Sequence, residues 1–275
     1  MQRILITGVS SGLGRALAEA ALAAGHAVIG TVRKGADAAV FEALDPTRAK
    51  AIVLDVTEFD KAAPAVAALE QKFGPIDALV NNAGYGHEGT VEESPLEELR
   101  RQFDVNVFGA VAMMKAVLPS MRQRRHGRII NITSMAGRVG LPGVSYYSGS
   151  KFALEGISES LDKEVSGLGI RVTAVAPGSF RTDWAGRSMV RTSRSIADYD
   201  AVFDPIRQRR QEASGRQTGD PARAAQALLE LIESASPPRH LVLGNDALLL
   251  LDDASKERAD ERSVWEHISR STAHD

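Results

Sequence analysis

The sequence predicts an α/β fold built on a parallel, doubly wound sheet of seven strands with helices on both faces. Three observations support this class. Short runs rich in β-branched residues recur seven times along the 275 residues. The runs are apolar throughout rather than alternating, as expected of strands covered on both faces. Most are separated by about 25 to 50 residues, which leaves room for one crossover helix each time.

The seven expected strands share this apolar, β-branched character and occupy residues 4–6, 27–29, 52–54, 78–80, 129–132, 172–175 and 240–243. No Pro/Ser-rich linker, internal repeat or low-complexity run separates them. Residues 1–275 are therefore predicted to form a single domain.

Capping residues predict two of the helix starts. Ser94 is followed by Pro95 and, three positions after the serine, by Glu97, a pattern typical of an N-cap serine. Asp220 followed by Pro221 predicts the start of another helix.

Two segments depart from the strand–helix pattern. Residues 183–218 show no clear period, and a loop of this length inside a compact domain is typical of a lid over a binding site. Residues 245–275 form a C-terminal extension with helical spacing of its apolar residues, so we expect a helix there.

Composition excludes several classes of protein. Hydrophobic residues make up 44% and charged residues 25% of the chain, which is typical of a globular domain. The net charge of -2 does not favour a nucleic-acid partner. The absence of cysteine fits a reducing compartment, and no stretch approaches the roughly 18 consecutive apolar residues of a membrane span. With no signal peptide expected before the first strand, we predict a cytoplasmic protein without a membrane partner.

A glycine-rich turn follows the first expected strand and predicts a dinucleotide site. Gly8 permits a tight turn, Gly12 lets the backbone approach a pyrophosphate, and Gly14 lets helix and strand pack closely. A glycine trio alone also occurs in ordinary turns, but its place between strand one and a helix favours the Rossmann type. The residues expected to contact the cofactor here are Gly8, Ser10, Ser11, Gly12, Leu13 and Gly14.

The end of the second strand favours NADP(H) over NAD(H). Arg33 stands where an NAD-preferring fold places Asp or Glu, and its guanidinium suits a 2′-phosphate, with Lys34 adding charge. In the alternative interpretation, Arg33 and Lys34 lie in a solvent-exposed turn without a ligand, and Asp37 binds the ribose. At the end of the third strand, Asp55 and Val56 are placed to bracket an adenine, although Asp55 is equally well explained as a turn-initiating residue.

Further motifs along the chain resemble those of the short-chain dehydrogenase/reductase family, in the family's order and spacing. They are the Gly8 to Gly14 turn, Asn81-Asn82-Ala83-Gly84, Asn106, Ser134, Tyr147-Ser148-Gly149-Ser150-Lys151, and Pro177-Gly178 with Thr182. The resemblance implies an NAD(P)(H)-dependent oxidoreductase that uses the catalytic tetrad Asn106, Ser134, Tyr147 and Lys151. It also implies cofactor contacts for Asn82, Ala83, Gly84, Tyr147, Lys151, Pro177, Gly178 and Thr182, and a water anchored by Asn106.

The residue types support this chemistry on their own terms. Tyr147 and Lys151 are four positions apart and so share one face of a helix. An ammonium about 4 Å from the phenol, at an effective dielectric near 20, would lower the tyrosine pKa by about three units. Tyr147 is then expected to donate a proton to a carbonyl oxygen that Ser134 holds by a hydrogen bond.

The substrate is less well defined by the sequence. Ser134, Tyr146, Tyr147 and Trp184 are expected to contact it, with Tyr146 either lining the pocket or packing. The apolar residues expected near the carbonyl predict a moderately bulky, apolar ketone or aldehyde. Six histidines without ligand spacing, and no cysteine, predict no metal site.

Two other functions stay open. One is a 3-oxoacyl reductase in which Arg187, Arg191 and Arg194 read the phosphate of an acyl carrier. The other is a protein that binds NADP(H) as a sensor without turnover, which the intact tetrad disfavours.

The C-terminal extension bears on assembly. Many relatives in the resembled family pair into tetramers through the edge of the seventh strand. Here the apolar residues Leu248, Leu249, Leu250, Trp265 and Ile268 are expected to fold the extension against its own subunit. This predicts a monomer, or a homodimer built on the helices beginning near Ser94 and Tyr147. In the alternative, the charged run 252–262 marks a disordered tail that leaves tetramers possible.

Overall fold

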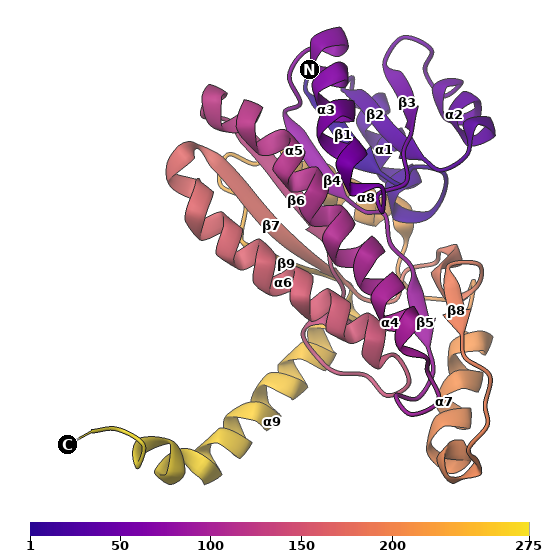
Figure 1. The fold of residues 1–275 in the computed structure, drawn as a ribbon, viewed down its shortest axis with the longest axis vertical. Helices are drawn as coiled ribbons and strands as arrows, with labels where there is room; N and C mark the ends of the chain where they lie inside the picture. The colour runs from indigo at the N-terminus through magenta and orange to yellow at the C-terminus, as the bar shows by residue number, and fades with distance from the viewer. Residues whose placement is uncertain (275) are drawn as a thin grey trace.

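A seven-stranded parallel sheet forms the centre of the protein (Figure 1). The computed structural model describes residues 1–274. The strand order is β3-β2-β1-β4-β6-β7-β9, and every neighbouring pair is parallel. The strands are β1 (Arg3–Thr7), β2 (Ala27–Val32), β3 (Ala49–Val53), β4 (Ala78–Asn81), β6 (Gly127–Ile132), β7 (Ile170–Pro177) and β9 (His240–Leu243). The predicted fold class and all seven strands are confirmed.

Helices cover both faces of the sheet. α1 (Gly12–Ala23), α2 (Gly35–Glu42) and α8 (Pro221–Glu233) pack on one face, and α3 (Phe59–Phe73), α5 (Gly109–Arg124) and α6 (Ser145–Val165) on the other. Along β1, Ile4 and Ile6 belong to the apolar core beneath α1, α2 and α8, while Leu5 belongs to the core on the opposite face, beneath α3, α5 and α6. Both faces of the strands are therefore buried, which explains their uninterrupted apolar sequence.

The strand order reverses between β1 and β4, because β2 and β3 lie on one side of β1 while β4, β6 and β7 lie on the other. In an open parallel sheet, ligands bind beyond the carboxyl ends of the strands at such a reversal. The motifs at Gly8, Asn82, Ser134 and Gly178 all follow these carboxyl ends. The topology thus gathers residues from four strands at one edge of the sheet.

Residues 183–218 are more ordered than expected. They contain β8 (Met189–Arg191) and α7 (Asp200–Glu212), where the sequence predicts an irregular loop. β8 pairs in parallel with β5 (Gly86–Glu88) to form a second, two-stranded sheet beside the main one (Figure 1). These elements escape sequence analysis because both strands have three residues and α7 buries only Phe203.

The two predicted helix starts have different outcomes. Asp220 caps α8, since its carboxylate accepts a hydrogen bond from the Ala222 N–H at 2.8 Å. Ser94 is wrong as an N-cap, because α4 (Leu96–Phe103) begins two residues later and the serine hydroxyl donates to the Thr90 carbonyl at 2.5 Å. The competing acceptor in the preceding turn takes the hydroxyl away from the helix.

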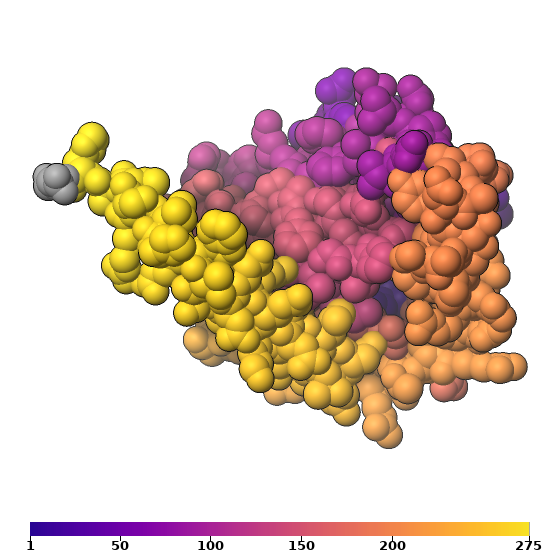
Figure 2. All heavy atoms as spheres, turned by 90° about the horizontal axis from the view of Figure 1, so that it is seen from below, coloured from indigo at the N-terminus to yellow at the C-terminus, as the bar shows by residue number. Residues whose placement is uncertain are grey.

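The C-terminal extension forms one helix, α9 (Asn245–Arg270), which leaves the body of the protein (Figures 1 and 2). Its first turns pack through the buried residues Ala247 and Ala254, but Trp265 is 59% exposed and Ile268 is also exposed. The expectation of a helix is confirmed. The expectation that the extension folds against its own subunit is wrong for the predicted anchors Leu248 and Leu249, which are exposed, and for the whole distal half. The charged residues between Ala254 and Trp265 supply no apolar face to bury.

Within residues 1–274, one helical segment, Leu96–Arg124, meets the length and composition of a membrane span, with a mean hydropathy of 1.2. It comprises α4, the π-helical turn Asp104–Phe108 and α5. Met113, Val117 and Met121 of α5 lie in the core beneath the sheet, so packing accounts for the apolar character of this helix.

Candidate active site

The glycine-rich turn after β1 has the geometry that a dinucleotide requires. Gly8 (φ 75°) and Gly12 (φ 64°) both adopt left-handed conformations that favour glycine. A Cβ at Gly14 would overlap the Gly8 carbonyl and the Asn82 amide, so this glycine permits close packing. A Cβ at Gly12 would find only Thr182 within 4 Å, at 3.8 Å, which leaves its backbone open to a phosphate. The residues of this turn therefore fit the pyrophosphate of a dinucleotide cofactor.

Asn82 and Ala83 support this turn from the neighbouring strand. Their backbone N–H groups donate to Thr7 Oγ1 at 3.0 and 2.9 Å. The Asn82 side-chain amide donates to the carbonyls of Thr7 and Gly8, both at 2.9 Å. The segment after β4 thus fixes the main chain of the glycine-rich turn. Ser10, Ser11 and Leu13 lie within that turn and at the start of α1.

The residues expected to bind the adenosine end of the cofactor differ in their exposure and in their contacts with the rest of the protein. Arg33 is exposed just after β2, with α2 beginning two residues later. The Asp55 carboxylate accepts hydrogen bonds from the N–H and hydroxyl of Thr57, at 3.0 and 2.8 Å. This is the turn-initiating arrangement that the sequence left open. Val56 packs against Gly109, where a Cβ would lie 2.9 Å from its side chain.

The loop after β7 is held by a residue that sequence analysis missed. Gly178 N–H donates to the Leu243 carbonyl, and Ser179 N–H donates to Asp246 Oδ2, each at 2.8 Å. A Cβ at Gly178 would overlap the Asp246 carboxylate, so Pro177-Gly178 and the first turn of α9 fit together closely. The only sequence signal was an acidic residue in the first turn of a predicted helix.

Tyr147, Lys151 and Ser134 come together between α6 and the end of β6. Tyr147 and Lys151 are both buried, and the Lys151 Nζ lies 5.8 Å from the centre of the Tyr147 ring. The Nζ donates to the Ile132 carbonyl at 2.7 Å. Ser134 follows β6, where its Oγ accepts from the Ala136 N–H at 3.1 Å, and it lies close enough to Tyr147 to act on the pKa of that phenol. The predicted shared helix face is thus present.

The protonation of this pair differs from the expectation. Burial raises the pKa of Tyr147 to about 12, and the nearby Ser134 hydroxyl opposes this only in part. Burial also lowers the pKa of Lys151 to about 8, with the Glu155 carboxylate acting in the opposite direction. The expected lowering of the Tyr147 pKa by about three units is therefore wrong in direction, because desolvation of the phenolate dominates and the Lys151 ammonium is directed to the Ile132 carbonyl.

Asn106 lies in the π-helical turn Asp104–Phe108, a kind of irregularity common at functional sites. Its amide bonds the backbone N–H and carbonyl of Tyr85, both at 3.2 Å, and donates to Ser150 Oγ at 3.1 Å. A Cβ at Gly84 would lie 3.0 Å from Asn106 Oδ1 and 3.7 Å from Lys151 Nζ. Asn106 and Lys151 thus flank the same glycine.

The two aromatic residues expected at the substrate have separate positions. The Trp184 ring centre lies 5.0 Å from that of Tyr147, beside the catalytic candidates. Tyr146 instead donates its hydroxyl to the Ser94 carbonyl at 2.8 Å and stacks on His87, with centroids 5.2 Å apart. Of the two roles open to Tyr146, packing is the one that its contacts support.

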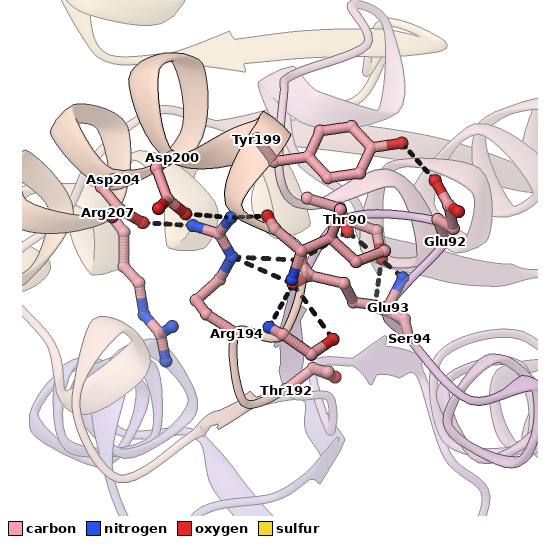
Figure 3. Close-up of polar contacts among 12 residues, drawn as sticks. Thr90, Glu92, Glu93, Ser94, Thr192, Arg194, Tyr199, Asp200, Asp204 and Arg207 are labelled. Atoms are coloured by element: carbon pink, nitrogen blue, oxygen red, sulfur yellow. Dashed lines mark hydrogen bonds and ion pairs between the residues drawn. The ribbon is translucent and has the colours of Figure 1, made fainter.

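Two buried carboxylates, also missed from the sequence, attach residues 183–218 to the body. Glu88 is fully buried and contacts the guanidinium groups of Arg191, Arg207 and Arg210 at 3.2, 3.2 and 3.4 Å. Glu93 contacts Arg194 at 3.0 Å and accepts the N–H groups of residues 195 and 196 (Figure 3). Chiefly through the first of these N–H groups, the pKa of Glu93 falls to about 2.

The doubly wound sheet, the glycine-rich turn and the buried Ser134–Tyr147–Lys151 group define a nicotinamide-dependent oxidoreductase. Residues 2–191 match the family described as short chain dehydrogenase, and the chain belongs to that family.

Relatives of nearly the same length are known. The chain is 36% identical over 269 residues to oxidoreductase BOA17 of Botryotinia fuckeliana, covering 98% of both chains. It is 37% identical over 245 residues to 3-ketodihydrosphingosine reductase of Bacteroides thetaiotaomicron, covering 88% of each. A crystal structure of a short-chain dehydrogenase from Streptomyces avermitilis superposes with a TM-score of 0.92 at 39% identity, covering 99% of this chain and 100% of that one.

Proposed function

We propose that the protein uses NADP(H) to interconvert a ketone or aldehyde with the corresponding alcohol. The observation that carries the proposal is the convergence of Ser134, Tyr147 and Lys151 beside the glycine-rich turn. When bound, the nicotinamide supplies or accepts the hydride.

Each side chain then has a distinct task. The Tyr147 hydroxyl donates its proton to the carbonyl oxygen during reduction and accepts it back during oxidation. Ser134 holds that oxygen by a hydrogen bond. Protonated Lys151 stabilises the Tyr147 phenolate by its charge and binds the nicotinamide ribose, while Asn106 anchors a water on the path of the proton.

NADP(H) is preferred in this proposal because of Arg33. Its exposed guanidinium stands at the end of β2, free to form a bidentate contact with a 2′-phosphate. The Gly8–Gly14 turn, with Thr182 across from Gly12, would hold the pyrophosphate, and Asn82 to Gly84 and Pro177-Gly178 would line the nicotinamide side. In support, a serine dehydrogenase solved in complex with NADP⁺ superposes with a TM-score of 0.75 at 25% identity.

The proposed substrate is an apolar, moderately bulky carbonyl compound. Val144, Leu141 and Trp184 pack around Tyr147, so the surroundings of the reacting group are apolar. The 3-oxoacyl alternative has sequence support, since a 3-oxoacyl-[acyl-carrier-protein] reductase of Haemophilus influenzae is 38% identical over 179 residues, covering 65% of this chain.

The arginines expected to read an acyl-carrier phosphate are engaged elsewhere. Arg187 pairs with Asp183 at 3.1 Å, Arg191 with Glu88 and Arg194 with Glu93. Because a phosphate would have to displace these carboxylates, two of them buried, the apolar substrate is favoured.

The test incubates the protein with a panel of apolar ketones and acyl-carrier thioesters. Turnover is measured as the loss of absorbance of the reduced nicotinamide, once with NADPH and once with NADH. We expect turnover of apolar ketones with NADPH, and its loss in Tyr147→Phe. Cofactor binding by the wild type without turnover of any carbonyl would instead favour the sensor.

A further inference from the structure

Four consecutive residues at the end of β6 each contact α6. Asn131 donates to Ser158 Oγ at 2.8 Å, and the Ile132 carbonyl accepts from Lys151. Thr133 Oγ1 lies 2.5 Å from Glu155 Oε1 and 2.7 Å from the Val175 carbonyl, and Ser134 lies beside Tyr147. The strand end and the helix are thus joined by a continuous series of polar contacts. Two of the four helix partners are Tyr147 and Lys151, and the proposed chemistry leaves Glu155 without a role.

Tyr147, Lys151 and Glu155 are spaced four residues apart and form one stripe along α6. Glu155 is the buried third member of this stripe, with its residue 8% exposed. A buried carboxylate is costly unless it is paired, so its partners show what holds it there.

Those partners come from the segment that follows β6 and from β9. Thr133 follows β6 and precedes Ser134 directly. Arg138, which follows the 3₁₀ turn Met135–Gly137, forms an ion pair with Glu155 Oε2 at 3.2 Å. His240 of β9 places its Nδ1 3.2 Å from the same oxygen. Glu155 therefore contacts the segment carrying Ser134 on both sides of that serine.

We propose that Glu155 is a positioning residue of the active site, which fixes the Ser134 segment through Thr133 and Arg138 and keeps Lys151 charged. Its effect on catalysis rests on the proposed function. Its effect on Lys151 does not, because the two side chains lie one helical turn apart whatever the reaction is.

The charges around Glu155 determine whether this residue raises or lowers the pKa of Lys151. Lys151 and Glu159 lie on its own helix, Arg138 and His240 face it from the two neighbouring elements, and Arg258 of α9 donates to the Arg138 carbonyl. The carboxylate raises the pKa of Lys151 against the effect of burial. Removing the negative charge must therefore lower the pKa of Lys151 further below about 8.

Glu155→Gln tests this electrostatic role, because the amide keeps the size and can still accept from Thr133. Lysine labelled with ¹³C at Cε reports the pKa of Lys151 by NMR, with the signal assigned by its loss in Lys151→Met. We expect a pKa lower by on the order of one unit. The protonated fraction at pH 8 then drops from about one half to about one tenth, so kcat/KM falls about fivefold there.

Glu159→Gln is the matched control, one turn further along α6 and more exposed, where its carboxylate pairs with Lys163 at 2.6 Å. It should change neither the Lys151 titration nor the pH profile. Thr133→Val tests the positioning role and should lower kcat at every pH without moving the Lys151 pKa.

A Lys151 titration that is the same in Glu155→Gln as in the wild type would overturn the electrostatic role. Native kcat in Thr133→Val would overturn the positioning role. If the wild type turns over no carbonyl, the proposed function fails, and the NMR titration still decides whether Glu155 keeps Lys151 charged.

Discussion

The pKa of Tyr147 is set by the burial of its side chain more than by nearby charges. Spacing places an ammonium on the same helix face, and this could be predicted from sequence. The desolvation that raises the tyrosine pKa to about 12 cannot be predicted from the sequence. Burial is set by Leu141 and Val144, from the loop before α6, and by Trp184, from residues 183–218. The site residues could thus be named from motifs, whereas their protonation could not.

The first prediction concerns Tyr147→Phe, which removes only the proposed acid. General acid–base catalysis typically contributes at least about 100-fold, so kcat should fall by that factor while NADPH still binds. Steady-state kinetics and cofactor titration provide the measurement.

Tyr146→Phe is the matched control for that substitution. It removes one hydrogen bond to the Ser94 carbonyl and should keep kcat within a few-fold of the wild type. Near-native kcat in Tyr147→Phe would contradict the assignment of the acid.

The second prediction concerns pH. Tyr147, with a pKa of about 12, stays protonated across the neutral range, whereas Lys151 loses its charge as the pH rises through about 8. Since the neutral amine no longer stabilises a phenolate, kcat/KM for reduction should fall above about pH 8. A pH–rate profile from 6 to 10 checks this, and a flat profile would argue against a role for charged Lys151.

The third prediction concerns Arg33→Ala. A hydrogen bond to a charged group contributes roughly 1.5 to 3 kcal/mol, so NADPH should lose at least about tenfold in kcat/KM relative to NADH. Comparing both cofactors in wild type and variant measures the effect. If Asp37 holds the ribose instead, Asp37→Asn should impair NADH use and Arg33→Ala should have little effect.

At the scale of elements, strands that are buried on both faces could be predicted, and residues 183–218 could not. The seven strands have a strong local signal because their whole sequence is apolar. α7 is held by ion pairs with Glu88, more than a hundred positions earlier in the chain, and β8 pairs with β5 at a similar separation. Such long-range contacts leave no local period, and Pro205 inside α7 further obscures it.

The fourth prediction concerns Glu88→Gln at this attachment. The substitution leaves three largely buried guanidinium groups without their carboxylate, and breaking a buried ion pair costs about 3 to 5 kcal/mol. Residues 183–218 should open and become susceptible to limited proteolysis. Glu92→Gln, at an exposed carboxylate that accepts a hydrogen bond from the Tyr199 hydroxyl, should leave the digestion pattern unchanged. Identical patterns for both variants would contradict the attachment.

At the scale of the whole molecule, we propose either a monomer or a homodimer built on the helices that begin near Ser94 and Tyr147. Leu96 on α4, Phe108 after it and Phe152 on α6 are 60%, 53% and 40% exposed, and they lie on the helices named for that contact. We expect light scattering to give a mass of about twice 29.4 kDa, or of one chain. A mass near four chains would show that the assembly prediction is wrong.

The fifth prediction separates the two halves of α9. A chain ending at residue 259 keeps Asp246, Ala247 and Ala254, and should retain wild-type kcat and melting temperature. A chain ending at residue 244 loses the acceptor of the Ser179 N–H, and so should bind NADPH more weakly. Equal cofactor affinity in the two truncated chains would exclude a role for Asp246.

The distal half of α9 also makes the protein convenient to label. From Ala254, the last buried residue of the helix, to Ser269 the axis rises about 22 Å at 1.5 Å per residue. Because the chain contains no cysteine, Ser269→Cys would introduce its sole thiol, on an exposed surface well beyond the last contact with the body. A fluorophore or surface tether attached there would report on or immobilise the enzyme without approaching the nicotinamide edge of the sheet.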